Sequence, residues 1–407
     1  MRTLSSRLAF FAGLALSATV GNSFAAGYPV SGQCDGYPRI NVSTPPGFCV
    51  GVVADGFTFP RGILPLSNGD ALLVDMGGWQ NNKGSVWRLH FQNSTVQKTR
   101  VLDKLDRPHG IVMGPDKNVY VGVVGGVIRF KPDQTPAVAE HMIGGTSGMP
   151  ALPATGRHPL VSLLFDKDGQ LLVNTGSESD NCDAAAGQSV CKEAEGKEAR
   201  GLVRRYRFDK PGGKFIDWQV FSSGLRNSVA LALHGESGTI WQGENSRDAI
   251  GRKLNLPNDN DLPHDEINRL EAGANYGWPY CYDNNLPSPE FPKADCKKTR
   301  TPVKLLPGHA APLGMAFYTA QKFPASWQGN LLVGFHGYRD NGHRLVAFAT
   351  DQNGAPTGNF KSLIEGWGAK GAQPMGAPVD VRVAADGSVL ITEDRNADVL
   401  RLVYIGK

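Results

Sequence analysis

Arginine and histidine side chains recur where successive copies of one repeated segment begin. They are Arg61, Arg107 with His109, Arg157 with His158, Arg226 with Asn227, and His309. Guanidinium groups form paired hydrogen bonds with carboxylates and phosphates, and a neutral imidazole accepts a proton near neutral pH. Buried positive charge also needs a partner. The recurrence therefore predicts a site for a polyanion. For any single residue, an ordinary structural hydrogen bond remains the alternative.

A second polar stretch combines carboxylates with turn-forming residues. It covers 244–248, with the sequence Glu-Asn-Ser-Arg-Asp, and is followed by Asp259, Asp261, Asp265 and Glu266 on a segment that we expect to be a loop. Calcium prefers carboxylate and backbone carbonyl oxygens from irregular chain of this kind. The spacing of an EF-hand is absent. A calcium site and a solvated acidic loop are equally compatible with this pattern.

These residues must be positioned by a unit that recurs six times along the chain. Each copy has an apolar segment, a tight turn and a second apolar strand, and the copies occupy 59–78, 107–126, 158–177, 225–246, 312–337 and 378–396. Turns such as Asn68-Gly69 and Asp168-Gly169 are strong hairpin signals, because glycine tolerates the positive φ of tight turns. Each copy is therefore predicted to be an antiparallel meander.

Hairpin repeats of about 50 residues favour radially arranged blades. We therefore expect an all-β fold, a six-bladed β-propeller of four-stranded antiparallel blades. Phe48–Ala54 should pair with 399–404 and close the ring, because an open ring would expose a strand edge. A two-sheet sandwich or a large barrel is the alternative, since alternation of apolar residues alone does not separate these architectures. The third and fourth repeat intervals are long and predict insertions.

The N-terminal segment resembles a signal peptide. Arg2 and Arg7 precede an apolar run over 8–20, and small residues around Ser23 and Ala25 fit a cleavage site. We expect residues 1–25 to be this peptide, residues 26–407 to form one propeller domain, and the protein to be periplasmic or secreted. No later stretch is apolar enough for membrane insertion. The formal charge of +4 comes from interspersed charges, so nucleic acid is not an implied partner.

The chain contains six cysteines, and an oxidising compartment favours disulfides. They fall into three neighbouring couples: Cys34 with Cys49, Cys182 with Cys191, and Cys281 with Cys296. Six thiols allow fifteen pairings, so these couples are predicted only from their proximity in sequence. A zinc cluster is disfavoured, because the chain has no Cys-x-x-Cys pair.

Several segments resemble one known family over nearly the whole mature chain. The most specific are 158–172, 224–233 and the stretch from Trp241 to Tyr280, which includes Glu-Ile-Asn at 266–268 and Asn-Tyr-Gly-Trp-Pro at 275–279. They resemble the glucose/sorbosone dehydrogenases, soluble quinoproteins with a six-bladed propeller that use pyrroloquinoline quinone and calcium. Segments 244–248 and 262–268 look closest to the L-sorbosone dehydrogenase branch.

The resemblance also implies residue roles. His158 corresponds to the family's general base, and Arg226 with Asn227 corresponds to the pair that contacts the quinone. The family holds calcium partly through main-chain carbonyls of a Gly-Pro pair, and here the resemblance places Ser246 and Arg247 at that position. Carbonyl ligands depend little on side-chain identity, and Asp248 adds a carboxylate.

Other family positions differ in this chain. The arginines that hold the cofactor's carboxylates are replaced by Gly376 and Pro378, and the second-blade Gln-Gly-Gly is replaced by Arg107-Pro108-His109. Cationic or imidazole groups elsewhere on the predicted channel face are candidates for the cofactor's carboxylates. They are Arg107, His109, His309, His336, Arg339, Lys370 and Arg395.

The sequence thus predicts a periplasmic quinoprotein dehydrogenase. It would oxidise the hydroxyl group of an aldose, or the hydrated aldehyde of a related sugar such as sorbosone, with His158 as base. It would use pyrroloquinoline quinone and calcium, and pass electrons to an external acceptor. A calcium-dependent lactonase-type hydrolase is one alternative, although it needs carboxylates converging on the channel. A propeller that only binds a sugar or a protein is another.

Overall fold

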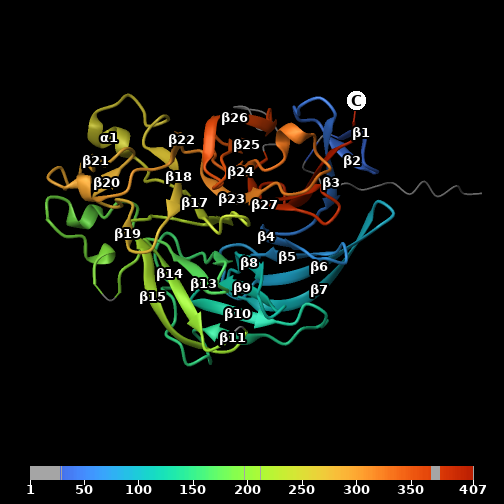
Figure 1. Ribbon diagram of the computed structural model, residues 1–407, viewed down its shortest axis with the longest axis horizontal. Helices are drawn as coiled ribbons and strands as arrows, with labels where there is room; N and C mark the ends of the chain where they lie inside the picture. The colour runs from blue at the N-terminus through green and yellow to red at the C-terminus, as the bar shows by residue number, and fades with distance from the viewer. Residues whose placement is uncertain (1–27, 29, 197, 211, 368–375, 407) are drawn as a thin grey trace, which may run out of the picture.

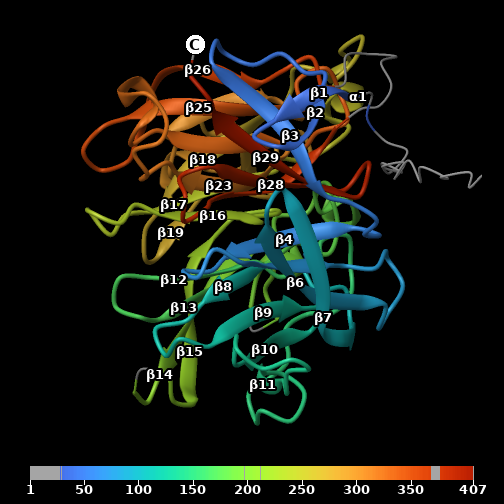
Figure 2. The same ribbon diagram turned by 90° about the vertical axis from the view of Figure 1, so that its right-hand side faces the viewer.

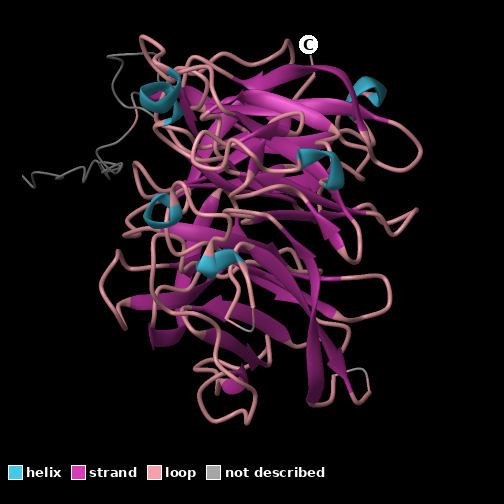
Figure 3. Cartoon of the chain, turned by 90° about the vertical axis from the view of Figure 1, so that its left-hand side faces the viewer, coloured by secondary structure: helices cyan, strands magenta, loops and turns pink. Residues whose placement is uncertain are grey.

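The computed structural model describes residues 28, 30–196, 198–210, 212–367 and 376–406. Strands and loops make up most of it, and the helices are short, as Figure 3 shows. The predicted signal peptide at 1–25 and the candidate Lys370 lie outside the described residues. Within them, no helix is both long and apolar enough to cross a membrane.

Six antiparallel sheets form the six predicted blades, and Figure 1 shows them arranged in a ring. In the order in which the strands pair, blade one contains β4 (Pro60–Pro65), β5 (Ala71–Asp75), β6 (Gly84–Gln92) and β7 (Thr95–Leu105), and blade two contains β8 (Ile111–Met113), β9 (Val119–Val123), β10 (Gly126–Phe130) and β11 (Glu140–Ile143). Blade three contains β12 (Leu163–Phe165), β13 (Leu171–Thr175), β14 (Leu202–Phe208) and β15 (Phe215–Ser223), and blade four contains β16 (Ala230–Leu233), β17 (Ile240–Glu244), β18 (His264–Leu270) and β22 (Lys304–Gly308). Blade five contains β23 (Pro312–Phe317), β24 (Leu331–Phe335), β25 (Arg344–Thr350) and β26 (Pro356–Ile364), and blade six contains β27 (Pro378–Val383), β28 (Val389–Glu393), β29 (Asp398–Tyr404) and β3 (Phe48–Ala54).

The ring closes between the two ends of the chain, as predicted. β3 pairs antiparallel with β29, with Val50 opposite Leu402, and the two strands lie side by side in Figure 2. The hairpin of β1 (Val30–Cys34) and β2 (Tyr37–Ile40) extends this sixth sheet. Strand pairing between distant segments removes the edge that an open ring would expose.

The second strand of every blade is the most deeply buried element. β5, β9, β13, β17, β24 and β28 are buried at all five of their positions. Such strands contact a neighbouring blade on each face, which explains why their sequences are mostly apolar rather than alternating. Several nevertheless end in a polar residue, such as Asp75, Thr175, Glu244 and Glu393.

The turns between the first and second strands place these polar ends. Gly69 has φ +90° in the first blade, and Lys117 takes a similar left-handed conformation, with φ 61°, in the second. Because the two strands run in opposite directions, the start of the first strand and the end of the second lie at the same end of a blade. That end of the ring is called the channel face below.

The two long intervals carry the predicted insertions, and both are stapled by disulfides. All three predicted disulfides are confirmed: Cys34–Cys49, Cys182–Cys191 and Cys281–Cys296. The second insertion has two parts, α1 (Ile250–Leu254) before β18, and β19 (Ala274–Asn275), β20 (Cys281–Tyr282) and β21 (Leu286–Pro287) after it. It packs against the first insertion, since Asn181 Nδ2 donates to Glu290 Oε1 at 3.1 Å. Together they cover the left-hand edge of Figure 1.

Candidate active site

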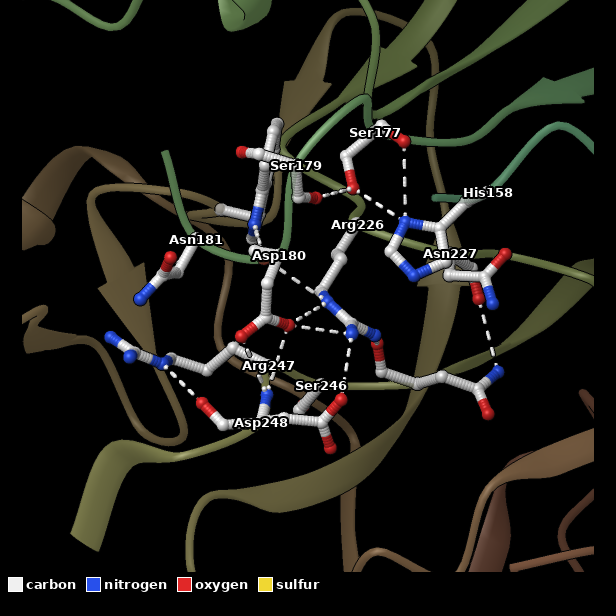
Figure 4. A network of polar contacts seen from close by, with 12 residues as sticks. His158, Ser177, Ser179, Asp180, Asn181, Arg226, Asn227, Ser246, Arg247 and Asp248 are labelled. Atoms are coloured by element: carbon white, nitrogen blue, oxygen red, sulfur yellow. Dashed lines mark hydrogen bonds and ion pairs between the residues drawn. The ribbon is translucent and has the colours of Figure 1, made fainter. Parts of the chain in front are cut away.

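His158 lies at the opening of the third blade, next to the end of β13 (Figure 4). Its Nδ1 is 2.8 Å from the Ser177 hydroxyl and 3.2 Å from the Ser177 carbonyl oxygen. The Ser177 hydroxyl donates its only proton to the Ser179 carbonyl at 2.7 Å. Ser177 must therefore accept from His158, so the imidazole proton is on Nδ1. This tautomer leaves a lone pair on Nε2.

The surroundings of His158 keep its ring neutral. Burial lowers the pKa of His158, and the nearby Arg226 guanidinium lowers it further, to about 3. Nε2 has no hydrogen-bond partner among the described residues. A neutral ring with a fixed tautomer and a free lone pair can accept a proton from a bound hydroxyl group.

Arg226 connects the openings of two blades. Its Nη2 is 2.6 Å from the Asp180 carboxylate and 3.3 Å from the Asp248 carboxylate, and Nη1 donates to the Asn245 carbonyl at 2.9 Å. The side chain is 6% exposed. Its fork is therefore held by acceptors from both insertions, which fixes where its positive charge lies relative to His158 (Figure 4).

Asp248 and His309 form the next contact around the channel face. His309 Nδ1 is 3.5 Å from Asp248, and His309 Nε2 lies 2.6 Å from the Asp259 carbonyl. Burial lowers the pKa of His309, but Asp248, the Asp259 carbonyl and Asp265 together outweigh it, so the net shift of this pKa is upward. Through the same pair and Arg226, the pKa of Asp248 falls to about 2. Asp248 is therefore an anion throughout the physiological pH range.

The backbone at Ser246 and Arg247 offers carbonyl oxygens, while their other groups are used within the protein. The Ser246 amide donates to Asp265 Oδ1 at 2.8 Å, and the Arg247 guanidinium pairs with the buried Glu290. Neither residue's carbonyl oxygen accepts a hydrogen bond from the described residues. The Arg247 side chain points to the protein interior, so only the backbone of this residue is available to a cation.

Two acidic residues that we expected on a loop lie elsewhere. Asp265 and Glu266 belong to β18 and are buried. Asp265 accepts from the amides of Ser246 and Ala311, at 2.8 and 2.6 Å, and burial raises its pKa to about 6. These two hydrogen bonds hold the backbone at Ser246 and Ala311 in place. The expectation was wrong because the inserted loop ends before these two residues.

Glu244 has a similar supporting role at the end of β17. It accepts from the Asn227 amide at 3.0 Å and the Ser228 hydroxyl at 2.9 Å. Burial raises its pKa to about 7. These bonds fix the backbone of the Arg226-Asn227 pair, and the Asn227 side-chain amide has no hydrogen-bond partner among the described residues.

Another predicted group lies on the opposite part of the channel face, in blades one, two, five and six. Arg61 donates Nε to His109 Nδ1 at 3.0 Å and pairs with Asp394, whose other oxygen is 2.9 Å from His336 Nε2. All four side chains are buried. Burial and the adjacent Arg61 charge hold the pKa of His109 well below its usual range. These four residues, called the Arg61 cluster, form one connected network in which Asp394 supplies the carboxylate.

The remaining candidates are Arg107, Arg339 and Arg395. Arg107 pairs with its neighbour Asp106 at 2.7 Å, and Arg339 pairs with Asp259 at 2.8 Å. The Arg395 guanidinium lies 5.1 Å from the centre of the Tyr338 ring. Most of the predicted cations therefore already have an acidic partner, and Arg395 is the exception in this group.

Three residues of the channel face that follow second strands were not predicted from the sequence. Ser177 and Asp180 follow β13, and Asp394 follows β28. These polar positions directly after buried strands were a usable signal, because they must reach the same face as the blade openings.

The chain matches one protein-family model over residues 42–399, described as TrAA12-like. Among curated proteins, an aldose sugar dehydrogenase of Escherichia coli is 29% identical over 195 residues, which cover 46% of this chain and 47% of the relative. The chain spans about half the length of the first curated relatives that it matches, 49% and 47%.

Two solved structures share the fold over almost their full lengths. The calcium structure of the Trichoderma reesei enzyme of carbohydrate-active family AA12 has a TM-score of 0.72 and 19% identity, covering 94% of this chain and 99% of that one. The holo form of the pyranose dehydrogenase PQQ domain from Coprinopsis cinerea has a TM-score of 0.70 and 20% identity, covering 90% and 98%. At this identity the likeness shows a common fold.

Proposed function

Because the chain belongs to the TrAA12-like family, we propose that it is a dehydrogenase that oxidises a sugar with pyrroloquinoline quinone and calcium. The observation that carries this proposal is His158, a neutral imidazole with a fixed tautomer and a free Nε2 beside the Arg226 cation. The named relatives act as support, since one is an aldose sugar dehydrogenase and others are structures of a calcium form and of a PQQ domain.

The described residues fit both groups at this part of the face. The carbonyl oxygens of Ser246 and Arg247 have no hydrogen-bond donor among the described residues, and the neighbouring Asp248 carboxylate is anionic. Hard oxygen ligands of this kind are those that calcium takes. The side-chain amide of Asn227 and the Arg226 guanidinium would supply donors for the oxygens of a quinone. The family resemblance assigns the same pair to that role.

The chain's own residues account for binding and proton transfer. Bound at this site, pyrroloquinoline quinone would supply the hydride acceptor, and calcium would supply Lewis acidity. His158 removes the hydroxyl proton at Nε2, Ser177 holds the ring through Nδ1, and Asp180 fixes the guanidinium of Arg226. Proton and hydride leave the substrate separately, so the hydroxyl-bearing carbon of an aldose, or of the hydrated form of an aldehyde, becomes a carbonyl.

The finer assignments belong to the same proposal. We take the substrate to be an aldose or a sorbosone-like aldehyde, on the resemblance of segments 244–248 and 262–268 to the sorbosone dehydrogenases. Electrons would pass to an external acceptor. The predicted signal peptide supports a periplasmic or secreted protein. Arg107, His109, His309, His336, Arg339 and Arg395 remain the candidates for the quinone carboxylates.

A dye-linked assay tests the proposed activity. Purified mature protein with added calcium and pyrroloquinoline quinone should reduce an artificial acceptor when an aldose or sorbosone is supplied, and should need both additions. Hydrolysis of a lactone panel in the same preparation serves as the control for the rival hydrolase. Absence of dye reduction, together with lactone hydrolysis that needs only calcium, would refute the dehydrogenase.

We predict that His158 remains neutral in mildly acidic solution. Its lowered pKa means that the free base, the form able to accept a proton, persists as the pH falls below 6.5. Nuclear magnetic resonance of histidine-labelled protein without cofactor should show the ring as the Nδ1–H tautomer from pH 8 down to about pH 4. His158→Gln identifies the resonance. Protonation of this ring near pH 6.5 would contradict the prediction.

A further inference from the structure

A crevice of about 800 Å³ lies beside the third blade, outside the candidate active site. Strands β14 and β15 form one wall, and the segment before β12 and the first insertion form the others. Its lining includes Leu152, Pro153, Ser179, Gln188, Arg204 and Trp218. Its volume is within the range of small-molecule sites.

Arg204 is an unusual member of this wall. The described residues include four buried arginines, and Arg61, Arg226 and Arg247 each pair with a carboxylate. Arg204 is 4% exposed, yet it makes no ion pair in the described part of the chain, and its Nε has no hydrogen-bond partner. A buried charge without a partner is strongly unfavourable.

The neighbours of Arg204 do not neutralise it. The guanidinium lies 4.2 Å from the centre of the Trp218 ring, a favourable but weaker contact than an ion pair with a carboxylate. Burial raises the pKa of the Tyr206 hydroxyl, although the Arg204 charge opposes this rise, so the hydroxyl stays protonated. A phenol carries no compensating charge at neutral pH. The crevice wall therefore presents a guanidinium group that has no acidic partner among the described residues.

The opposite side of the crevice restricts which anion can pair with Arg204. Glu178, Glu193 and Glu198 also line it, together with Lys192 and Arg200. The Glu193 carboxylate is held by the amides of Glu178 and Ser179, at 2.7 and 2.9 Å. These acids repel a ligand that is negative all over, but they accept hydrogen bonds from hydroxyl groups. The indole of Trp218 offers a flat apolar surface, which suits the face of a sugar ring.

We propose that this crevice is a second carbohydrate site, which binds a uronic acid residue through Arg204 and Trp218. The sugar carboxylate pairs with the Arg204 guanidinium, its ring lies on Trp218, and its hydroxyl groups face the glutamates. The site adjoins the active site in the chain, since Ser179 lines the crevice and also accepts the hydrogen bond of Ser177. Its existence does not depend on the proposed dehydrogenase activity.

Calorimetric titration of the full chain with digalacturonate, without quinone or calcium, tests this site. We expect one molecule bound per chain, binding of neutral galactobiose at least tenfold weaker, and no competition by inorganic phosphate. Arg204→Met should weaken digalacturonate binding at least tenfold. The thermal unfolding midpoint of this variant should equal or exceed that of the unmodified protein, because an unpaired buried charge is removed. His158→Ala should leave this binding unchanged.

Arg207→Met is the matched control, because Arg207 lies on the same strand but pairs with Asp217 at the surface. This variant should bind digalacturonate as the unmodified protein does. The proposal is overturned if digalacturonate does not bind, if Arg204→Met binds it equally well, or if phosphate or galactobiose displaces it at similar concentrations.

Discussion

The His158→Ala variant is expected to lose a factor of about 10² to 10⁴ in kcat, the usual contribution of a general base. His158 supplies the free lone pair that is directed by Ser177 on this part of the channel face. Alanine removes the proton acceptor but leaves the Arg226 network and the Ser246-Arg247 backbone in place. Steady-state dye reduction measures kcat, and a quinone titration followed by absorbance measures cofactor affinity, which should change by less than threefold.

Ser177→Ala tests the orientation of the His158 ring while the ring itself is kept. Without the hydroxyl, Nδ1 retains only the longer contact of 3.2 Å to the Ser177 carbonyl, so the ring loses part of its orientation. We expect kcat to fall by about tenfold, with the substrate KM nearly unchanged.

Equal loss of quinone binding and turnover in His158→Ala would make His158 a binding or structural residue instead of the base.

The second large effect is expected for Arg226→Met, which should lower both stability and quinone affinity. The substitution leaves Asp180 without its cation, and the side chains of Arg226 and Asp180 are only 6% and 12% exposed. Breaking a buried ion pair by removing one partner lowers the free energy of unfolding by about 3 to 5 kcal/mol. Urea unfolding measures the stability of the cofactor-free protein.

The double variant Arg226→Met with Asp180→Asn distinguishes the two roles of Arg226. Neutralising Asp180 removes the uncompensated charge, so much of the lost stability should return. Quinone affinity should not return, because the guanidinium is still missing. If Arg226→Met unfolds and binds quinone like the unmodified protein, neither the ion-pair account nor the assigned cofactor contact holds.

The channel face is less cationic overall than the sequence implies. Arg61, Arg107, Arg226 and Arg339 each have a carboxylate partner. A bound polyanion therefore meets guanidinium groups that are already positioned, but it must share them with these acids. Such preorganised groups lose little conformational freedom on binding, which favours selectivity over high net attraction.

Local signals were sufficient to predict the architecture. Six tight turns between apolar strands predicted the blades, and the apolar segment Phe48–Ala54 predicted the closing pair with β29. The disulfides were predictable from proximity because each cysteine couple closes a short loop, of 15 or 9 residues. In these cases, the partners of each contact are identified by strong local patterns or by short separation.

The partners within the site could not be predicted in the same way. Asp394 is 333 residues from Arg61 in the sequence, and Asp180 is 46 residues from Arg226. Their pairing depends on how blades are placed around the ring, which the local pattern does not encode. The sequence also does not reveal that Arg204 lacks an acidic partner, because its surroundings are formed by an insertion and two strands.

A single-turnover experiment tests the central claim most directly. The protein is loaded with calcium and pyrroloquinoline quinone, freed of excess quinone and mixed anaerobically with an aldose or sorbosone, with no external acceptor present. We predict that the absorbance of the bound quinone changes to that of its reduced form, with one sugar oxidised per quinone, and that His158→Ala binds the quinone but slows this change at least a hundredfold. Retained binding with no reduction by any sugar of the panel would contradict the claim that this site is a sugar dehydrogenase.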